Sequence, residues 1–439
     1  MIADGVFFSA MVGLGESYVP AFALATGLGE VVAGLVATLP MLAGALLQLV
    51  TPFAVRHLRS YRRWVVLCAS LQALSFAPLA LGAARGQIGL VGLGLATVAY
   101  WGFGMATSPA WNAWVTSLVP APMRSSFFAR RTRAAQAALF VAILLGGMLL
   151  QWGRGHDAEL ACFAALFAAA MACRGVSARC LASQSEAPGL AAQHQTLGPG
   201  EILAAVRSAH SGRVLSYLIG MQVVVNVAAP FFTPYMLGPL GFSYAEFMLL
   251  TAAAFLARVI VLPVIGRFGE RHGIRFVLWW GALGIVPLPV LWLVSDAFAY
   301  LLVVQIVAGS AWAALELATL LSFFEGVADH ERTSVLSAFN LANAVAIAIG
   351  ALIGSQIFLG AEGALSAYAW LFGVSSAGRL LMLGVLRGTR PARRATGIEL
   401  RTLAVRPSLG AITRPILASL NRQPRPDDDE PGSSGEAAP

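Results

Sequence analysis

Three ionisable side chains stand inside long apolar stretches of the chain: Glu16, Arg258 and Glu316. Glu16 falls within MVGLGESYVP (residues 11–20), which is apolar on both flanks. A charged group at the centre of a lipid bilayer costs at least ~2.5 kcal/mol on insertion scales, so such residues are usually functional. An acid in apolar surroundings holds its proton more readily than one in water. Glu16 could therefore exchange a proton or bind a substrate, or it could be a permanently neutral acid bonded to a backbone carbonyl.

Pro20 stands four residues after Glu16. Proline has no N–H, so an α-helix through this point leaves the carbonyl of Glu16 without its usual donor. The sequence therefore predicts a bend beside the acid.

Arg258 and Glu316 lie eight or nine residues from one end of their apolar stretches. At about 1.5 Å per helical residue, both lie roughly 12–14 Å from the same membrane surface. We expect them to form an ion pair, because an uncompensated charge at this depth is costly. The pair could be a static salt bridge, or it could break when Glu316 is protonated or when Arg258 meets an anionic substrate. Arg379 lies nearer an end of its stretch, where it could extend to the surface.

The sequence offers little support for other kinds of chemistry. Cys68, Cys162, Cys173 and Cys180 form no C-x-x-C pair, so we expect neither a disulfide framework nor a metal site, and no cofactor. The chain lacks the phosphate-binding loop G-x-x-x-x-G-K-[ST], which excludes a self-contained ATP-driven pump. No His, Asp or Cys cluster lies in the apolar stretches, so an enzyme is not expected.

The composition is that of a membrane protein. Of 439 residues, 58% are hydrophobic and 11% are charged, whereas soluble domains average about 25% charged residues. The formal charge of +8 does not indicate nucleic-acid binding, because the basic residues fall in short loops, where they orient a chain in a membrane.

A membrane span needs about 20 mostly apolar residues, and twelve stretches meet this requirement. They are 3–25, 30–54, 64–84, 88–118, 134–152, 158–176, 213–237, 243–265, 274–295, 298–322, 334–359 and 364–387. The longest connection, 177–212, separates an amino-terminal bundle (1–176) from a carboxy-terminal bundle (213–390), and 199–209 within it could form a short surface helix. The tail, 391–439, is too polar and too rich in Pro and Gly to fold.

Arginines concentrate in the connections that follow even-numbered spans. They are Arg56, Arg59, Arg62, Arg63, Arg124, Arg130, Arg131, Arg133, Arg174, Arg179, Arg207, Arg213, Arg267, Arg271, Arg275 and Arg332. The opposite side holds only Arg85 and Arg154, while Asp4 sits at the entrance of the first span. The positive-inside rule therefore predicts a multi-pass protein of the cytoplasmic (inner) membrane with both termini in the cytoplasm.

The two bundles share a weak repeat. PFAVRH (52–57) follows the second span and RFGERH (267–272) follows the eighth, so that Phe, Arg and His recur at a constant offset. Two sets of six spans with such a repeat are typical of secondary transporters.

At this point the chain resembles the major facilitator superfamily. The family's loop signature is matched between the eighth and ninth spans by Gly266, Glu270, Arg271, Gly273 and Arg275, with Glu in place of the usual Asp. The resemblance implies an all-α membrane protein with twelve transmembrane helices in two pseudo-symmetric six-helix bundles.

The equivalent loop of the first half departs from the signature, because Val55 replaces the acid and Thr51 the Gly. Arg124 and Arg332 match arginines that the family places at the start of the fifth and eleventh helices. The signature and these arginines could form a gate that closes the cytoplasmic side, or they could be a solvated loop that only fixes topology.

In this family the first, fourth, seventh and tenth helices line a central cavity. The resemblance therefore places Glu16, Tyr100, Trp101, Gln222 and Asn226 around it. One acid, two amides and two aromatic rings suit an amphipathic organic solute.

Three functions remain open at this stage. The first is a monomeric secondary active transporter that moves a small organic solute by alternating access, coupled to protons. The second is an uncoupled facilitator or a lipid flippase of the same fold. The third is a non-transporting membrane sensor or scaffold that acts through the tail.

Overall fold

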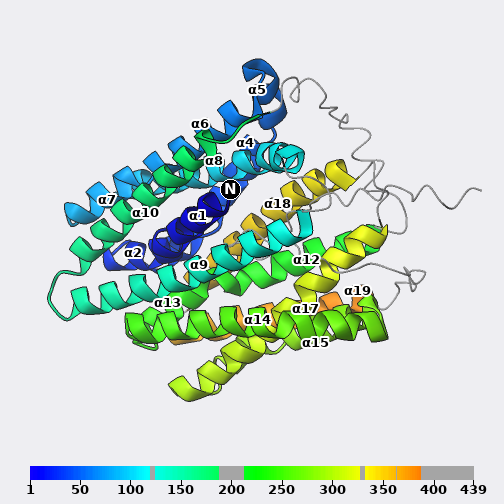
Figure 1. Ribbon diagram of the computed structural model, residues 1–439. Helices are drawn as coiled ribbons and strands as arrows, with labels where there is room; N and C mark the ends of the chain where they lie inside the picture. The colour runs from blue at the N-terminus through cyan, green and yellow to red at the C-terminus, as the bar shows by residue number, and fades with distance from the viewer. Residues whose placement is uncertain (119–123, 187–211, 327–331, 362, 387–439) are drawn as a thin grey trace, which may run out of the picture.

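The computed structural model describes residues 1–118, 124–186, 212–326, 332–361 and 363–386, and within this part all regular structure is helical. The helices form two bundles, one from each half of the chain (Figure 1). The predicted surface helix at 199–209 and the tail at 391–439 lie outside the described residues.

The first half contains six of the predicted spans, several of them broken into shorter helices. Its helices are α1 (Ile2–Leu14), the 3₁₀ turn η1 (Glu16–Tyr18), α2 (Val19–Ala25), α3 (Glu30–Val36), α4 (Leu39–Gln48), α5 (Thr51–Leu58), α6 (Tyr61–Leu74), α7 (Ala77–Ala84), α8 (Leu90–Leu118), α9 (Arg124–Arg154) and α10 (Glu159–Ala182). The last of them continues six residues beyond the predicted end of the sixth span.

The second half repeats this plan. Its helices are α12 (Gly212–Ala228), the 3₁₀ turn η4 (Ala229–Phe231), α13 (Phe232–Leu237), α14 (Tyr244–His272), α15 (Ile274–Ile285), α16 (Leu288–Leu291), α17 (Phe298–Gly326), α18 (Arg332–Gly360) and α19 (Ala364–Leu386).

Eleven helices in the described part are long and apolar enough to cross a membrane. The predicted ninth span, 274–295, forms only a shorter apolar helix, Phe276–Leu291. It is interrupted between α15 and α16, where Pro287 and Pro289 cannot donate backbone hydrogen bonds. The ninth predicted span is therefore present as a shorter, interrupted helix, and it packs against α17 within the bundle.

Small residues bring the helices of each bundle into close contact. A Cβ on Gly13 of α1 would lie 2.6 Å from the Cβ of Ala142 on α9, and a Cβ on Gly350 of α18 would lie 2.2 Å from the carbonyl of Val223 on α12. Helices in membranes associate through such close backbone approach rather than through a hydrophobic driving force. The first and fifth spans thus pack as the seventh and eleventh do.

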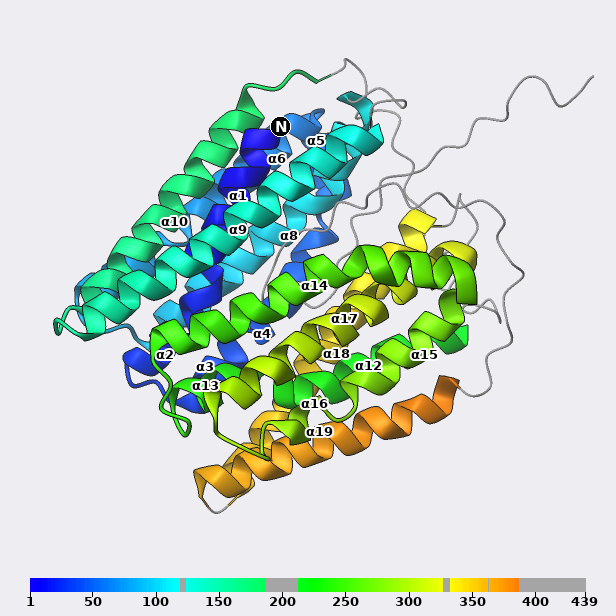
Figure 2. The ribbon, with the colours of Figure 1, turned by 60° about the horizontal axis from the view of Figure 1, so that its bottom comes forward.

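The two bundles meet where α9 packs against α14 and α4 against α18. They also meet around α2, α3 and α13, away from the end of the first half that carries the amino terminus (Figure 2). Here the Tyr244 hydroxyl donates to the Glu159 carboxylate at 2.5 Å, and a Cβ on Gly147 would lie 2.7 Å from the Cβ of Met248. Tyr18 and Phe247 make an edge-to-face contact at 6.4 Å. These contacts close one end of the space between the bundles.

Candidate functional site at the broken first span

The first span breaks at Glu16. The α-helix α1 ends at Leu14, one 3₁₀ turn covers Glu16–Tyr18, and α2 begins at Val19 with Pro20 in its first turn. The bend predicted from Pro20 is therefore present. The Glu16 carbonyl, however, is not left without a donor, because it accepts a hydrogen bond from the N–H of Val19 in the 3₁₀ pattern.

The seventh span breaks at the matching place. There α12 ends at Ala228, the turn η4 covers Ala229–Phe231, and α13 follows. Both breaks stand beside prolines, Pro20 in the first half and Pro230 in the second. Discontinuous helices in corresponding positions of two halves are a frequent mark of transporter binding sites, since they expose backbone groups and side chains inside the membrane.

The Glu16 carboxylate accepts a hydrogen bond from the hydroxyl of Tyr100 on α8, at 2.5 Å. The Tyr100 ring is held edge-on by Phe76 at 5.2 Å and by Trp101 at 5.6 Å. Glu16 itself is half-buried, whereas Tyr100 and Trp101 are buried. The structure thus brings together the acid and the two aromatic residues that the sequence assigned to one cavity.

Gln222 and Asn226 lie one turn apart on α12 and are both buried. The Asn226 side-chain amide donates to the Gln222 carbonyl at 2.8 Å and to the Gln222 side-chain oxygen at 3.4 Å. A Cβ on Gly350 of α18 would lie 2.9 Å from the Cβ of Asn226. In this conformation Asn226 therefore faces the contact between α12 and α18.

Arg258 on α14 and Glu316 on α17 form the expected ion pair, with Nη1 and Oε1 3.0 Å apart. The Arg258 side chain is 34% exposed and the Glu316 side chain 18% exposed, so the arginine is the less buried partner. The predicted ion pair is therefore confirmed, and it joins two helices that pack against each other.

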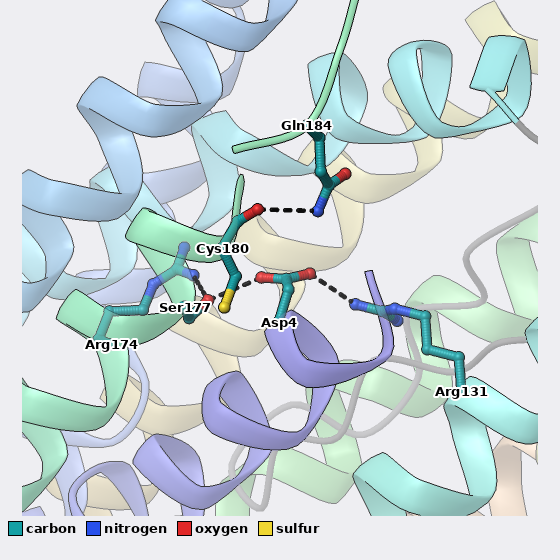
Figure 3. Close-up of polar contacts among 6 residues, drawn as sticks. All are labelled: Asp4, Arg131, Arg174, Ser177, Cys180 and Gln184. Carbon is teal, nitrogen blue, oxygen red and sulfur yellow. Dashed lines mark hydrogen bonds and ion pairs between the residues drawn. The ribbon is translucent and has the colours of Figure 1, made fainter. Parts of the chain in front are cut away.

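A second charged group lies in the first half and was not predicted from the sequence (Figure 3). Asp4 forms an ion pair with Arg131 at 3.1 Å and accepts a hydrogen bond from Ser177 at 2.7 Å. Arg174 donates to Ser177 and to Gln72, each at 2.8 Å. These side chains come from α1, α6, α9 and α10, so the network ties four helices together.

The predicted surface positions of Arg174 and Arg379 are wrong. Arg174 does not lie in a surface loop, because α10 continues past it and leaves the side chain 1% exposed. Arg379 does not extend to the surface either. It is 2% exposed, and its Nη1 donates to the Ile285 carbonyl at 2.8 Å. Since Pro289 has no N–H for that carbonyl, Arg379 replaces the missing helical donor.

The signature Gly266–Arg275 is mostly helical rather than a loop. Helix α14 runs to His272, and Gly273 alone connects it to α15 with φ of 91°. A positive φ of this size favours glycine, which explains the residue type at this position. Gly266 is buried and Arg271 is exposed, whereas the side chains of Glu270, Arg275, Arg124 and Arg332 lie outside the described residues.

The sequence was compared with protein-family models and with curated proteins. Residues 214–420, nearly the whole second half, match the family model "Major Facilitator Superfamily". The match covers somewhat less than half of the chain, and over this part the chain is similar to the major facilitator superfamily. Together with the apolar helices described above, this match indicates a multi-pass membrane protein. No curated protein matches the sequence.

Solved structures of transporters are similar over most of the chain. The nucleoside transporter NupG superposes with a TM-score of 0.68 at 12% identity, over 88% of this chain and 98% of that chain. The D-xylose-proton symporter superposes with a TM-score of 0.68 at 12% identity, over 89% of this chain and 96% of that chain. At this identity the likeness concerns the fold.

Across the described residues, no group of three or more His, Cys, Asp or Glu side chains could hold a metal ion. The four cysteines are free thiols.

Proposed function

We propose that the protein is a proton-coupled secondary transporter of a small organic solute, and that Glu16 carries the proton. The observation that supports this role is the hydrogen bond between Glu16 and Tyr100 at the break of the first span. A half-buried carboxylate at a helix break can accept a proton from water and can also face a bound solute.

The solute class follows from the groups around this acid. Tyr100 and Trp101 offer aromatic faces, while Gln222 and Asn226 offer amides if the contact between α12 and α18 shifts during the cycle. Such a set suits a neutral or cationic amphipathic organic molecule. The D-xylose-proton symporter among the fold neighbours supports proton coupling as a task that this fold performs.

The transport cycle that we propose is alternating access. In this structure the bundles contact each other around α2, α3 and α13. With both termini in the cytoplasm, this end is the outer one, and the conformation is closed to the outside. Opening it requires the Tyr244–Glu159 hydrogen bond to break, and closing the inner end engages the signature Gly266–Arg275 with Arg124 and Arg332 as a gate.

Arg258 and Glu316 form a second element of this mechanism, nearer the cytoplasm than Glu16. We propose that the pair stabilises one state of the cycle and that it opens when the bundles rearrange. The protein acts as a monomer in the cytoplasmic membrane.

The experiment begins with a solute. A thermal-shift screen of the purified full-length protein identifies compounds that raise its melting temperature, because ligands that bind the folded state stabilise it. The best compound is then used in proteoliposomes in two assays: accumulation driven by an imposed pH gradient, and counterflow exchange without a gradient.

Glu16→Gln should abolish accumulation and keep counterflow, because exchange needs substrate binding and conformational change but no net proton movement. Glu16→Asp is the matched control and should keep accumulation at a reduced rate. If Glu16→Gln accumulates solute as the wild type does, Glu16 is not the proton carrier. If the wild type shows no response to the pH gradient, the uncoupled facilitator is the correct function.

A further inference from the structure

A repeated pattern of three residue types gives each half of the chain a similar exposed helix face. A phenylalanine is followed three residues later by an arginine and four residues later by a histidine, and residues at these spacings share one side of an α-helix. The residues are Phe53, Arg56 and His57 on α5, and Phe268, Arg271 and His272 at the end of α14. All six side chains are exposed. We call these two groups the α5 face and the α14 face.

Both faces lie where a membrane span ends. The span Glu30–Gln48 is followed directly by α5, and the span Tyr244–Gly269 ends within the α14 face. The chain crosses the membrane six times between the ends of these two spans, so both faces lie on the same side of the bilayer. With both termini in the cytoplasm, this side is the cytoplasmic surface.

An exposed apolar stripe leads from the membrane interior to each face. On α14 it consists of Leu256, Ile260 and Val264, which are 45%, 61% and 56% exposed, and it continues into Phe268. The distance along the helix from Leu256 to Phe268 is about 18 Å, and one leaflet of the hydrocarbon core is ~15 Å thick. The stripe is therefore as long as a lipid acyl chain is deep. The corresponding exposed residues of the first half are Leu46, Leu49, Val50 and Phe53.

The charge at the end of each stripe favours an anion. Segment 51–63 contains four arginines and no acid, and segment 267–275 contains three arginines and one glutamate. Within the described part of the chain, neither Arg56 nor Arg271 takes part in an ion pair. A guanidinium group binds a phosphate through two parallel hydrogen bonds. Clusters of arginine just beyond a span are typical of sites for anionic lipids.

Ring contacts order the polar end of each face. The Arg56 guanidinium lies 5.0 Å from the centre of the Phe53 ring, in a cation–π contact. On α14 the His272 ring lies 4.2 Å from Phe268 and 5.5 Å from Phe276, measured between ring centres. In each half the phenylalanine therefore joins the apolar stripe to a basic side chain.

We propose that each face binds one anionic phospholipid, with the phosphate at the arginine and one acyl chain along the apolar stripe. Arg56 and Arg271 hold the two phosphates, and an imidazole N–H of His57 or His272 donates to the same headgroup. The lipid thus uses the two properties that the repeat preserves, an exposed ring and a cation one turn later. These sites are separate from the solute site at Glu16.

The test counts lipids bound to the purified, delipidated full-length protein by native mass spectrometry. Phosphatidylglycerol and phosphatidylcholine with identical acyl chains are added to the detergent solution in separate titrations. The wild type should bind two molecules of phosphatidylglycerol at a concentration several-fold below that needed for phosphatidylcholine. Glycerol 3-phosphate carries the anionic group without acyl chains, so an equal concentration of it should not displace the bound lipid.

Single arginine variants assign the two sites. Arg56→Gln and Arg271→Gln should each lower the number of tightly bound phosphatidylglycerol molecules from two to one, and the double variant should bind none tightly. Arg267 is also exposed and lies one residue before Phe268. Arg267→Gln removes the same charge from the same segment but leaves the α14 face intact, so it is the matched control and should bind two.

The proposal is wrong if the wild type binds the two phospholipids equally, because the arginines then serve only to orient the chain. This comparison needs no variant, so it decides even if a variant does not fold. The proposal is also wrong if glycerol 3-phosphate displaces the lipid, or if Arg267→Gln loses a lipid as Arg271→Gln does. These outcomes involve neither a transported solute nor Glu16, so the proposed function is tested separately.

Discussion

The two bundles share a helical plan but place their buried charges differently. In the first bundle, Asp4, Arg131 and Arg174 form one network that ties four helices, and Glu16 separately accepts the Tyr100 hydroxyl at the break of the first span. In the second bundle, Arg258 and Glu316 form a balanced pair, and Arg379 is bonded to a backbone carbonyl.

The two bundles therefore share the arrangement of helices, the positions of helix breaks and the close contacts at glycines. Their buried polar residues differ. The breaks at Glu16–Tyr18 and Ala229–Phe231 correspond, yet only the first carries an acid. We therefore expect proton coupling to belong to the first bundle, while the charges of the second bundle stabilise structure or one state of the cycle.

The largest loss of stability is expected for Asp4→Asn. The substitution removes the carboxylate that pairs with Arg131 and accepts from Ser177, and breaking a buried pair in this way costs about 3–5 kcal/mol. The measurement is the thermal or denaturant unfolding of the purified protein in detergent. Asp296 is exposed, so Asp296→Asn is the control and should change the free energy of unfolding by less than about 0.5 kcal/mol. Equal effects of the two variants would show that the Asp4 network contributes nothing to stability.

A smaller effect is expected for Arg258→Met, about 1–3 kcal/mol, because this pair is partly exposed to solvent. The double variant Arg258→Met/Glu316→Gln should regain most of that loss, since neither charge then remains. By contrast, Asp4→Asn/Arg131→Met should regain less, because the hydrogen-bonded chain from Arg174 through Ser177 also loses its carboxylate. If the two double variants recover equally, the charge networks of the two bundles do not differ as described.

The same double variant distinguishes the two interpretations of the Arg258–Glu316 pair. If the pair opens during the cycle, Arg258→Met/Glu316→Gln keeps its stability but transports slowly in proteoliposomes. If the pair is a static salt bridge, the variant transports at the wild-type rate, and the role that we propose for the pair is wrong.

A loss of stability similar to that of Arg258→Met is expected at Arg379. Arg379→Met removes the donor to the Ile285 carbonyl, and an unsatisfied buried carbonyl costs about 1–3 kcal/mol. Pro289→Ala restores a backbone N–H four residues after Ile285, so the loss caused by Arg379→Met should shrink in that background. Unfolding of the four proteins of this cycle measures the coupling. A loss that is the same in both backgrounds would contradict the replacement of a helical donor by Arg379.

Much of the fold could be predicted from the sequence, because spans depend on length and hydropathy. The Arg258–Glu316 pair could also be predicted, since residue counting gives depth. The interruption of the ninth span was missed although Pro287 and Pro289 were visible. Hydropathy values do not show that a proline interrupts a helix, whereas each proline removes one backbone hydrogen bond from it.

The Asp4 network could not be predicted in this way. Its hydrogen bonds join residues 127 and 173 positions apart, and only tertiary packing brings these together. Helices α9 and α10 also extend beyond the apolar stretches that mark spans, so Arg131 and Arg174 were assigned to loops. A charge just outside an apolar stretch is buried when the helix continues into a packed bundle.

The most direct test of the central claim measures protons exchanged when the screened solute binds. The purified protein is mixed with solute in weakly buffered detergent solution containing a pH indicator, at several values of pH. We expect the wild type and Glu316→Gln to exchange protons on binding, and Glu16→Gln to bind the solute without exchange. Undiminished proton exchange in Glu16→Gln, or its loss in Glu316→Gln alone, would contradict the assignment of coupling to the first bundle.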